Sequence, residues 1–145
     1  MSTEENKAKF RRGYEELFNQ GNLAIADELV RSDFINHEMP PGMVNRGPES
    51  LRQVAMMLRT AFPDLHFIIE ELVAEGDTVV GRMTMTGTHQ GDFVGIAPTG
   101  RSVRQAQVHF VRYLDGKAIE HRAVRDDLTM MQQLGVAPNP EFGRR

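Results

Sequence analysis

The fold is decided by residues 101–126, which read RSVRQAQVHFVRYLDGKAIEHRAVRD. Apolar residues alternate with polar ones in both halves of this stretch, a pattern typical of β-strands. The dipeptide Asp115-Gly116 between the halves is one of the strongest short signals for a hairpin turn. We therefore predict two antiparallel strands, at residues 101–114 and 117–125, joined by a tight turn.

The segments around this hairpin predict two more strands and several helices. Residues 65–75 and 78–89 are rich in β-branched and apolar residues, and Gly76-Asp77 between them is a second hairpin signal. Residues 33–42 break any regular pattern and are expected to form a loop. Apolar residues at helical spacing predict helices at residues 10–20, 22–29, 48–62 and 128–134, and the last residues are expected to form a tail.

Helices followed by an antiparallel meander predict an α+β fold. We expect residues 1–145 to form one domain in which three helices precede any strand. These helices would cover one face of a curved antiparallel sheet. A pocket can form between the two layers.

Composition excludes several classes of function. The chain has 145 residues, a net charge of -3 and a pI near 5.9, so it lacks the basic surface of a nucleic-acid-binding protein. No apolar run approaches the length that spans a membrane, and the acidic N-terminus does not resemble a secretory signal, so we expect a cytoplasmic protein. Without cysteine, carboxylates and imidazoles remain for chemistry, and the five histidines show no close metal-ligand spacing. We therefore expect acid–base chemistry on a small molecule and no metal site.

The residues of the strand at 101–114 that share one face indicate where the pocket lies. Every second residue of a strand points to the same side. Gln107 and His109 lie on one face between the apolar residues Val103, Val111 and Tyr113. Polar groups in such a position favour a cavity, although a core histidine that bonds to the backbone would also account for His109.

Two further residue groups are candidates for the site. Arg122 and Asp126 share a face of the next strand, and a guanidinium near the carboxyl group of Asp126 would lower its pKa. Asp126 or Asp127 could instead cap the following helix. His37 is either a turn residue or a binding residue, and His89 ends the inward face of the strand at 78–89.

A larger ordered set of residues resembles a known family. It comprises the run from Gly87 to Arg101, then Gln107-Val108-His109, Asp115-Gly116-Lys117, Glu120-His121-Arg122, Asp126 and Gln132-Gln133-Leu134-Gly135. Together these residues resemble the SnoaL-like polyketide cyclases, which have the nuclear transport factor 2-like fold. The resemblance implies a cone-shaped α+β barrel, usually dimeric or tetrameric, with an active site between the sheet and the helices.

The resemblance also implies a reaction and its residues. Family members close a ring by intramolecular aldol condensation and use neither metal nor cofactor. The acid/base aspartate of the family corresponds to Asp126, the pocket-lining glutamine and histidine to Gln107 and His109, and an asparagine of the early loop to Asn36. We expect Gln107 and His109 to stabilise an enolate.

The resulting hypothesis is a cofactor-independent cyclase or isomerase that acts on a polyketide-like β-dicarbonyl compound. Asn36 and Arg122 would orient the substrate, and His37 and His89 are further binding candidates. A non-catalytic binding module, a relative that assists hydroxylation and an epoxide hydrolase are alternatives on the same fold. We expect a homodimer or homotetramer that associates through the outer face of the sheet, where Val108 and Phe110 lie.

Overall fold

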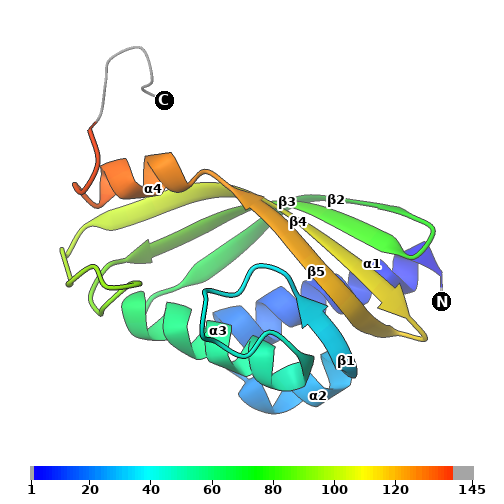
Figure 1. Ribbon diagram of the computed structural model, residues 1–145. Helices are drawn as coiled ribbons and strands as arrows, with labels where there is room; N and C mark the ends of the chain where they lie inside the picture. The colour runs from blue at the N-terminus through cyan, green and yellow to red at the C-terminus, as the bar shows by residue number, and fades with distance from the viewer. Residues whose placement is uncertain (1, 139–145) are drawn as a thin grey trace.

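The computed structural model describes residues 2–138, and residues 139–145 of the expected tail lie outside this range. Figure 1 shows a sheet that arches over α1, α2 and α3, with α4 at one end of the sheet. None of the helices within residues 2–138 is long and apolar enough to cross a bilayer. The elements in chain order are α1 (Thr3–Arg12), the π-helix η1 (Gly13–Asn19), the 3-10 helix η2 (Leu23–Ile25), α2 (Ala26–Leu29), β1 (Val30–Asn36), α3 (Gly47–Ala61), β2 (His66–Glu75), β3 (Thr78–Thr88), β4 (Ser102–Leu114), β5 (Lys117–Arg125) and α4 (Asp127–Gln133).

The sheet has five strands in the order β1-β5-β4-β3-β2. Neighbours are antiparallel except β1 and β5, which are parallel, so the sheet is mixed. The expectation that three helices precede any strand is therefore wrong, because residues 30–36 form β1 between α2 and α3. Val30, Phe34 and Asn36 of this strand are buried, and the intervening Asp33 is exposed. Residues 33–36 therefore belong to a strand and not to the expected loop, which they resembled because of the exposed Asp33.

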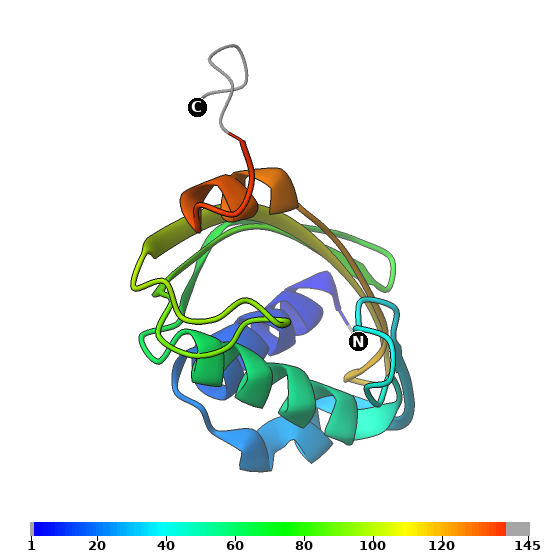
Figure 2. The ribbon, with the colours of Figure 1, turned by 60° about the vertical axis from the view of Figure 1, so that its left-hand side comes forward.

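Both predicted hairpins are present, and bulges bend the sheet. Asp115 and Gly116 have φ angles of 51° and 82°, as a tight two-residue turn with a right-handed twist requires. The ladder between β4 and β5 shifts register at Arg112/Tyr113, and that between β2 and β3 shifts at Ile69/Glu71. Bulges of this kind bend strands. Figure 2 shows the curved sheet wrapped around the helices.

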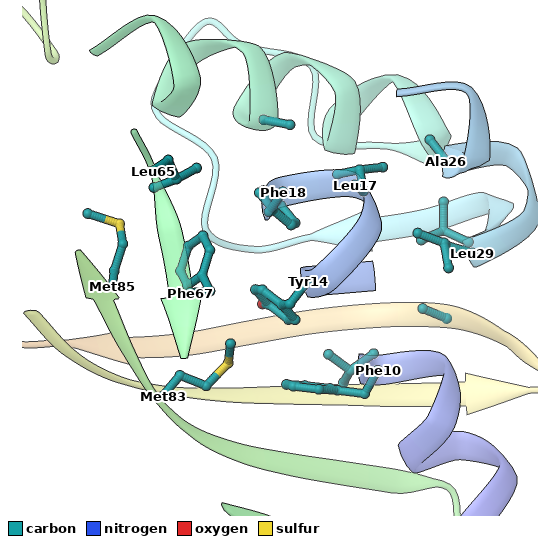
Figure 3. Close-up of a cluster of buried hydrophobic side chains, with 14 of the residues drawn as sticks. Phe10, Tyr14, Leu17, Phe18, Ala26, Leu29, Leu65, Phe67, Met83 and Met85 are labelled. Atoms are coloured by element: carbon teal, nitrogen blue, oxygen red, sulfur yellow. The ribbon is translucent and has the colours of Figure 1, made fainter. Parts of the chain in front are cut away.

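The helices fill the concave side of the sheet. A capping box between Ser2 and Glu5 starts α1, and Pro48 lies in the first turn of α3 as predicted. Helix α1 continues into η1, which ends near Gly21 with its φ of 73°. Figure 3 shows Tyr14 of η1 near Phe10, Phe18 and Phe67, at the centre of the buried cluster.

Candidate active site

The sheet and the helices enclose a cavity of about 400 Å³. Most of its wall is apolar, and the helices and all five strands contribute to it. The residues that form this apolar part include Phe10, Phe18, Phe34, Leu51, Val54 and Phe67. The volume and the apolar walls are those of a small-molecule site.

One side of the cavity is polar. It is formed by Asn36 of β1, by Gln105, Gln107 and His109 of β4, and by His121 of β5. Each of these residues is at most 9% exposed. They meet because alternation sends Gln105, Gln107 and His109 to the inner face of β4, as predicted, while Asn36 pairs with His121 across the parallel ladder. We call these five residues the polar wall.

Hydrogen bonds join the polar wall into one chain. Nδ1 of His121 lies 2.9 Å from Oδ1 of Asn36, and Nε2 of His121 lies 2.8 Å from Nδ1 of His109. Nε2 of His109 lies 2.6 Å from Oε1 of Gln107, whose Nε2 donates to Oε1 of Gln105 at 2.7 Å. The chain ends where Nε2 of Gln105 donates to the carboxyl group of Asp127 at 3.0 Å. It therefore runs from β1 to the start of α4.

Burial shapes the ionisation of this chain. It lowers the pKa of His121 to about 3, with smaller contributions from Arg125 and His37. Burial also holds the pKa of His109 well below its usual value, and His121 and Arg125 add to the effect. The Tyr14 hydroxyl lies 2.8 Å from Nδ1 of His109, and burial raises the pKa of this phenol. At neutral pH both imidazoles and the phenol are therefore uncharged.

An ion pair lies at the edge of the polar wall. Nη1 of Arg125 is 3.3 Å from Oε1 of Glu38, and both side chains are about one-quarter exposed and line the cavity. Asp127 also lines it. Within residues 2–138, no group of three His, Asp or Glu side chains is placed to hold a metal ion.

The structure brings together three of the predicted site residues, Asn36, Gln107 and His109. It does not place Arg122 with them, because the Arg122 side chain is 60% exposed and pairs with Glu120 at 3.5 Å. The expectation that Arg122 lines the pocket is wrong. Arg122 was expected in the pocket because it shares a face with Asp126, but the opposite face of β5, which carries His121 and Arg125, is the one that lines the cavity. A bulge adds Ile119 between the residues paired with Tyr113 and Arg112. Ala118 faces inward before this extra residue and His121 after it, so the inward face of β5 changes phase at the bulge.

Asp126 lies at the start of α4 and caps it. Its Oδ1 accepts from the backbone N–H of Thr129 at 3.1 Å, and its Oδ2 accepts from the Thr129 hydroxyl at 2.7 Å. The alternative reading of Asp126 as a helix cap is therefore confirmed. Its next neighbour, Asp127, is the carboxylate that reaches the cavity.

His37 and His89 do not line the cavity. His37 follows β1, and its Nε2 lies 2.9 Å from the carboxylate of Glu120. His89 is fully buried near Phe62 and Phe93, where its Nδ1 accepts from the backbone N–H of Thr99 at 3.1 Å. The expectation that these two residues bind substrate in the pocket is wrong, because local contacts hold both of them elsewhere.

Sequence reasoning missed His121, Tyr14 and Arg125. The signal for His121 and Arg125 was the alternate face of their strand, which carries His121, Ala123 and Arg125. Tyr14 was recognised only as part of the apolar stripe of its helix. Nothing local to the sequence shows that its hydroxyl contacts His109 from 95 positions away.

Comparison with known proteins adds independent information. The family model described as SnoaL-like polyketide cyclase matches residues 8–134. Aklanonic acid methyl ester cyclase DnrD from Streptomyces peucetius is 32% identical over 136 residues, which are 89% of this chain and 91% of that protein. Nogalonic acid methyl ester cyclase from Streptomyces nogalater is 31% identical over 119 residues, 81% of this chain and 89% of that protein. The solved structure of TsrD from Streptomyces laurentii has a TM-score of 0.85 at 25% identity and covers 94% of this chain and 99% of its own.

Proposed function

Because this chain belongs to the SnoaL-like polyketide cyclase family, we propose that it closes a ring in a polyketide-like β-dicarbonyl compound by intramolecular aldol addition. The polar wall inside a mostly apolar cavity is the observation that carries this proposal. The apolar part suits the flat body of such a compound. The polar wall suits the two carbonyl groups that react.

The reaction needs a proton acceptor and hydrogen-bond donors. A base breaks the C–H bond between two carbonyl groups, and its electron pair becomes that of an enolate. The enolate carbon then forms a C–C bond to a second carbonyl carbon, whose oxygen becomes an alkoxide and takes a proton. The product has the mass of the substrate, and the base is regenerated. A proton between two carbonyl groups is acidic enough for a modest base, and the site mainly has to orient the two ends.

Asn36 and Gln107 are suited to donate to the reacting oxygens. Nδ2 of Asn36 donates to Sδ of Met39 at 3.4 Å, and Nε2 of Gln107 contacts Sδ of Met85 at 3.6 Å. A thioether is a weak acceptor, so a substrate oxygen that replaces it gains a stronger hydrogen bond. Both amides line the cavity. His109 lies beside them, and we assign the proton transfer to it.

The proposal is tested with the methyl esters of aklanonic and nogalonic acid, the compounds in the names of the two relatives. The protein with EDTA and no added cofactor is expected to convert at least one of them into a product of unchanged mass and different chromatographic retention. His109→Gln is expected to lose this conversion, and His66→Gln, which changes an exposed histidine, is expected to keep it. A compound that binds in the cavity but stays unchanged would favour the non-catalytic binding module.

We also propose that two copies associate through the outer face of the sheet. Val124 is 68% exposed and is paired with Val108 across the ladder, next to Phe110, which is 41% exposed. Three adjacent apolar residues on a solvated face are suited to an interface between copies. Light scattering at micromolar concentration is expected to give the mass of a dimer or tetramer, and Val124→Lys is expected to shift it towards the monomer. A monomeric wild-type protein would contradict this.

A further inference from the structure

The hydrogen-bond chain contains a second imidazole, His121, whose contact with His109 allows a more specific assignment. Both rings are buried and line the cavity, and the two nitrogens that face each other are 2.8 Å apart. That distance is typical of an N–H···N hydrogen bond, which needs one hydrogen between the nitrogens. Whether a hydrogen lies between these two nitrogens depends on which ring nitrogens must carry a hydrogen to form the other hydrogen bonds of the chain.

One end of the chain is fixed by the backbone. Oδ1 of Asn36 accepts from the N–H of Glu38 at 3.0 Å, and Nδ2 of Asn36 points to Met39. This orientation leaves Oδ1 as the atom that faces His121. Because an amide oxygen only accepts, Nδ1 of His121 must carry a hydrogen. In a neutral ring Nε2 of His121 is then without one.

The other end is fixed by a carboxylate. Asp127 accepts from Nε2 of Gln105, so Oε1 of Gln105 faces Gln107 and must accept from it. The oxygen of Gln107 therefore faces His109, and Nε2 of His109 must carry a hydrogen. In a neutral ring Nδ1 of His109 is then without one.

Two neutral rings thus face each other with a lone pair on each nitrogen and no hydrogen between them. Burial favours the neutral rings, whereas the geometry of the contact suits one added hydrogen. We propose that the His109–His121 pair is the proton acceptor of the site and that, once it has accepted a proton, it shares that proton between Nδ1 of His109 and Nε2 of His121. This proposal deepens the proposed cyclase function and rests on it.

The Tyr14 hydroxyl gives the proton a path. Tyr14 lines the cavity, and its hydroxyl contacts Nδ1 of His109 directly. As the substrate C–H bond breaks, its electron pair stays on the enolate and the phenol oxygen takes the proton. The phenol passes its own hydrogen to Nδ1 of His109, where Nε2 of His121 shares it. The reverse transfer protonates the alkoxide, and the pair returns to its neutral state.

Nuclear magnetic resonance of protein labelled with ¹⁵N in histidine tests the pair without any substrate. At pH 7 we expect the hydrogen of His109 on Nε2 and that of His121 on Nδ1. On acidification, Nδ1 of His109 and Nε2 of His121 are expected to shift together with one midpoint as one proton is bound. A hydrogen on Nδ1 of His109 or on Nε2 of His121 at pH 7, or two independent midpoints, would overturn the proposal. Neither result tests the cyclase function, which the conversion assay measures separately.

Kinetics give a second readout once a substrate is converted. His121→Gln is expected to lower kcat by about 10²-fold or more with little change in KM. The wild-type kcat is expected to rise with pH as the pair loses its proton, and the variant to lack that rise. The charged or titratable groups that contact the pair or line the cavity with it include Lys9 of α1, Tyr14 of η1, His37 and Glu38 after β1, Tyr113 of β4, Arg125 of β5 and Asp127 of α4. His37→Gln is the control, because it removes a neighbouring imidazole and leaves the pair intact, so this variant is expected to keep the rise. An unchanged kcat in folded His121→Gln would refute the assignment.

Discussion

At the scale of single residues, the site depends on which atoms of neutral groups carry hydrogens. Tyr14, His109 and His121 are all uncharged at neutral pH because burial disfavours their charged forms. None of them is a strong base alone. Their arrangement lets two nitrogens share an added proton, since Nδ1 of His109 and Nε2 of His121 lie at hydrogen-bond distance.

Tyr14→Phe is expected to lower kcat by about 10²-fold, because the substitution removes the hydroxyl that carries the proton to His109. The ring and its contacts with Phe18 and Phe67 remain, so the loss of stability should be about 1 kcal/mol. Turnover assays and urea unfolding measure the two effects. Wild-type turnover in the folded variant would mean that the proton reaches the pair without this hydroxyl.

At the scale of the elements, the hairpins and α3 could be predicted because their signals are local. Asp115-Gly116 and Pro48 act through their own backbone preferences. Strand β1 could not be predicted, because its parallel pairing with β5 depends on a partner more than 80 positions away. The pocket face of β4 was predictable from alternation alone. The pocket face of β5 was not, because both alternate faces of this strand carry polar or charged residues and the extra residue at the bulge is visible only in the paired strands.

The role of Asp126 can be separated into capping of α4 and chemistry. Asn caps a helix about as well as Asp, so Asp126→Asn should keep stability, whereas Asp126→Ala should lose about 1 kcal/mol. If Asp126 acts only as a cap, Asp126→Asn should keep turnover. A general acid/base would instead lose about 10²–10⁴-fold in rate. Unfolding and turnover of both variants therefore test the acid/base role that the family resemblance implies.

At the scale of the whole molecule, the cavity makes stability depend on pH. Burial lowers the pKa of His121 from an ordinary 6.5 to about 3, and the pKa of His109 is lowered too. The unfolded chain binds protons below about pH 6.5 that the native protein does not, so acid favours unfolding. The free energy of unfolding is therefore unaffected by these histidines above about pH 6.5, and it decreases as the pH falls from 6.5 towards 3.

Urea unfolding at several pH values is expected to show this loss. Between pH 6.5 and 4.5 the free energy of unfolding should fall by up to about 1.4 kcal/mol per pH unit for one buried histidine. His66→Gln should keep the same dependence, because His66 is exposed. Stability that stays constant or rises on acidification would show that the rings gain protons as easily in the native protein as in the unfolded chain.

The thioether of Met39 has a consequence for oxidative conditions. Met39 is only half-buried, and the amide of Asn36 donates to its sulfur. Oxidation to the sulfoxide would turn this weak acceptor into a strong one, which would retain the Asn36 N–H and exclude a substrate oxygen. Mild peroxide treatment is therefore expected to weaken substrate binding, methionine sulfoxide reductase to restore it, and Met39→Leu to make the protein resistant. Equal sensitivity of Met39→Leu would place the damage at another methionine.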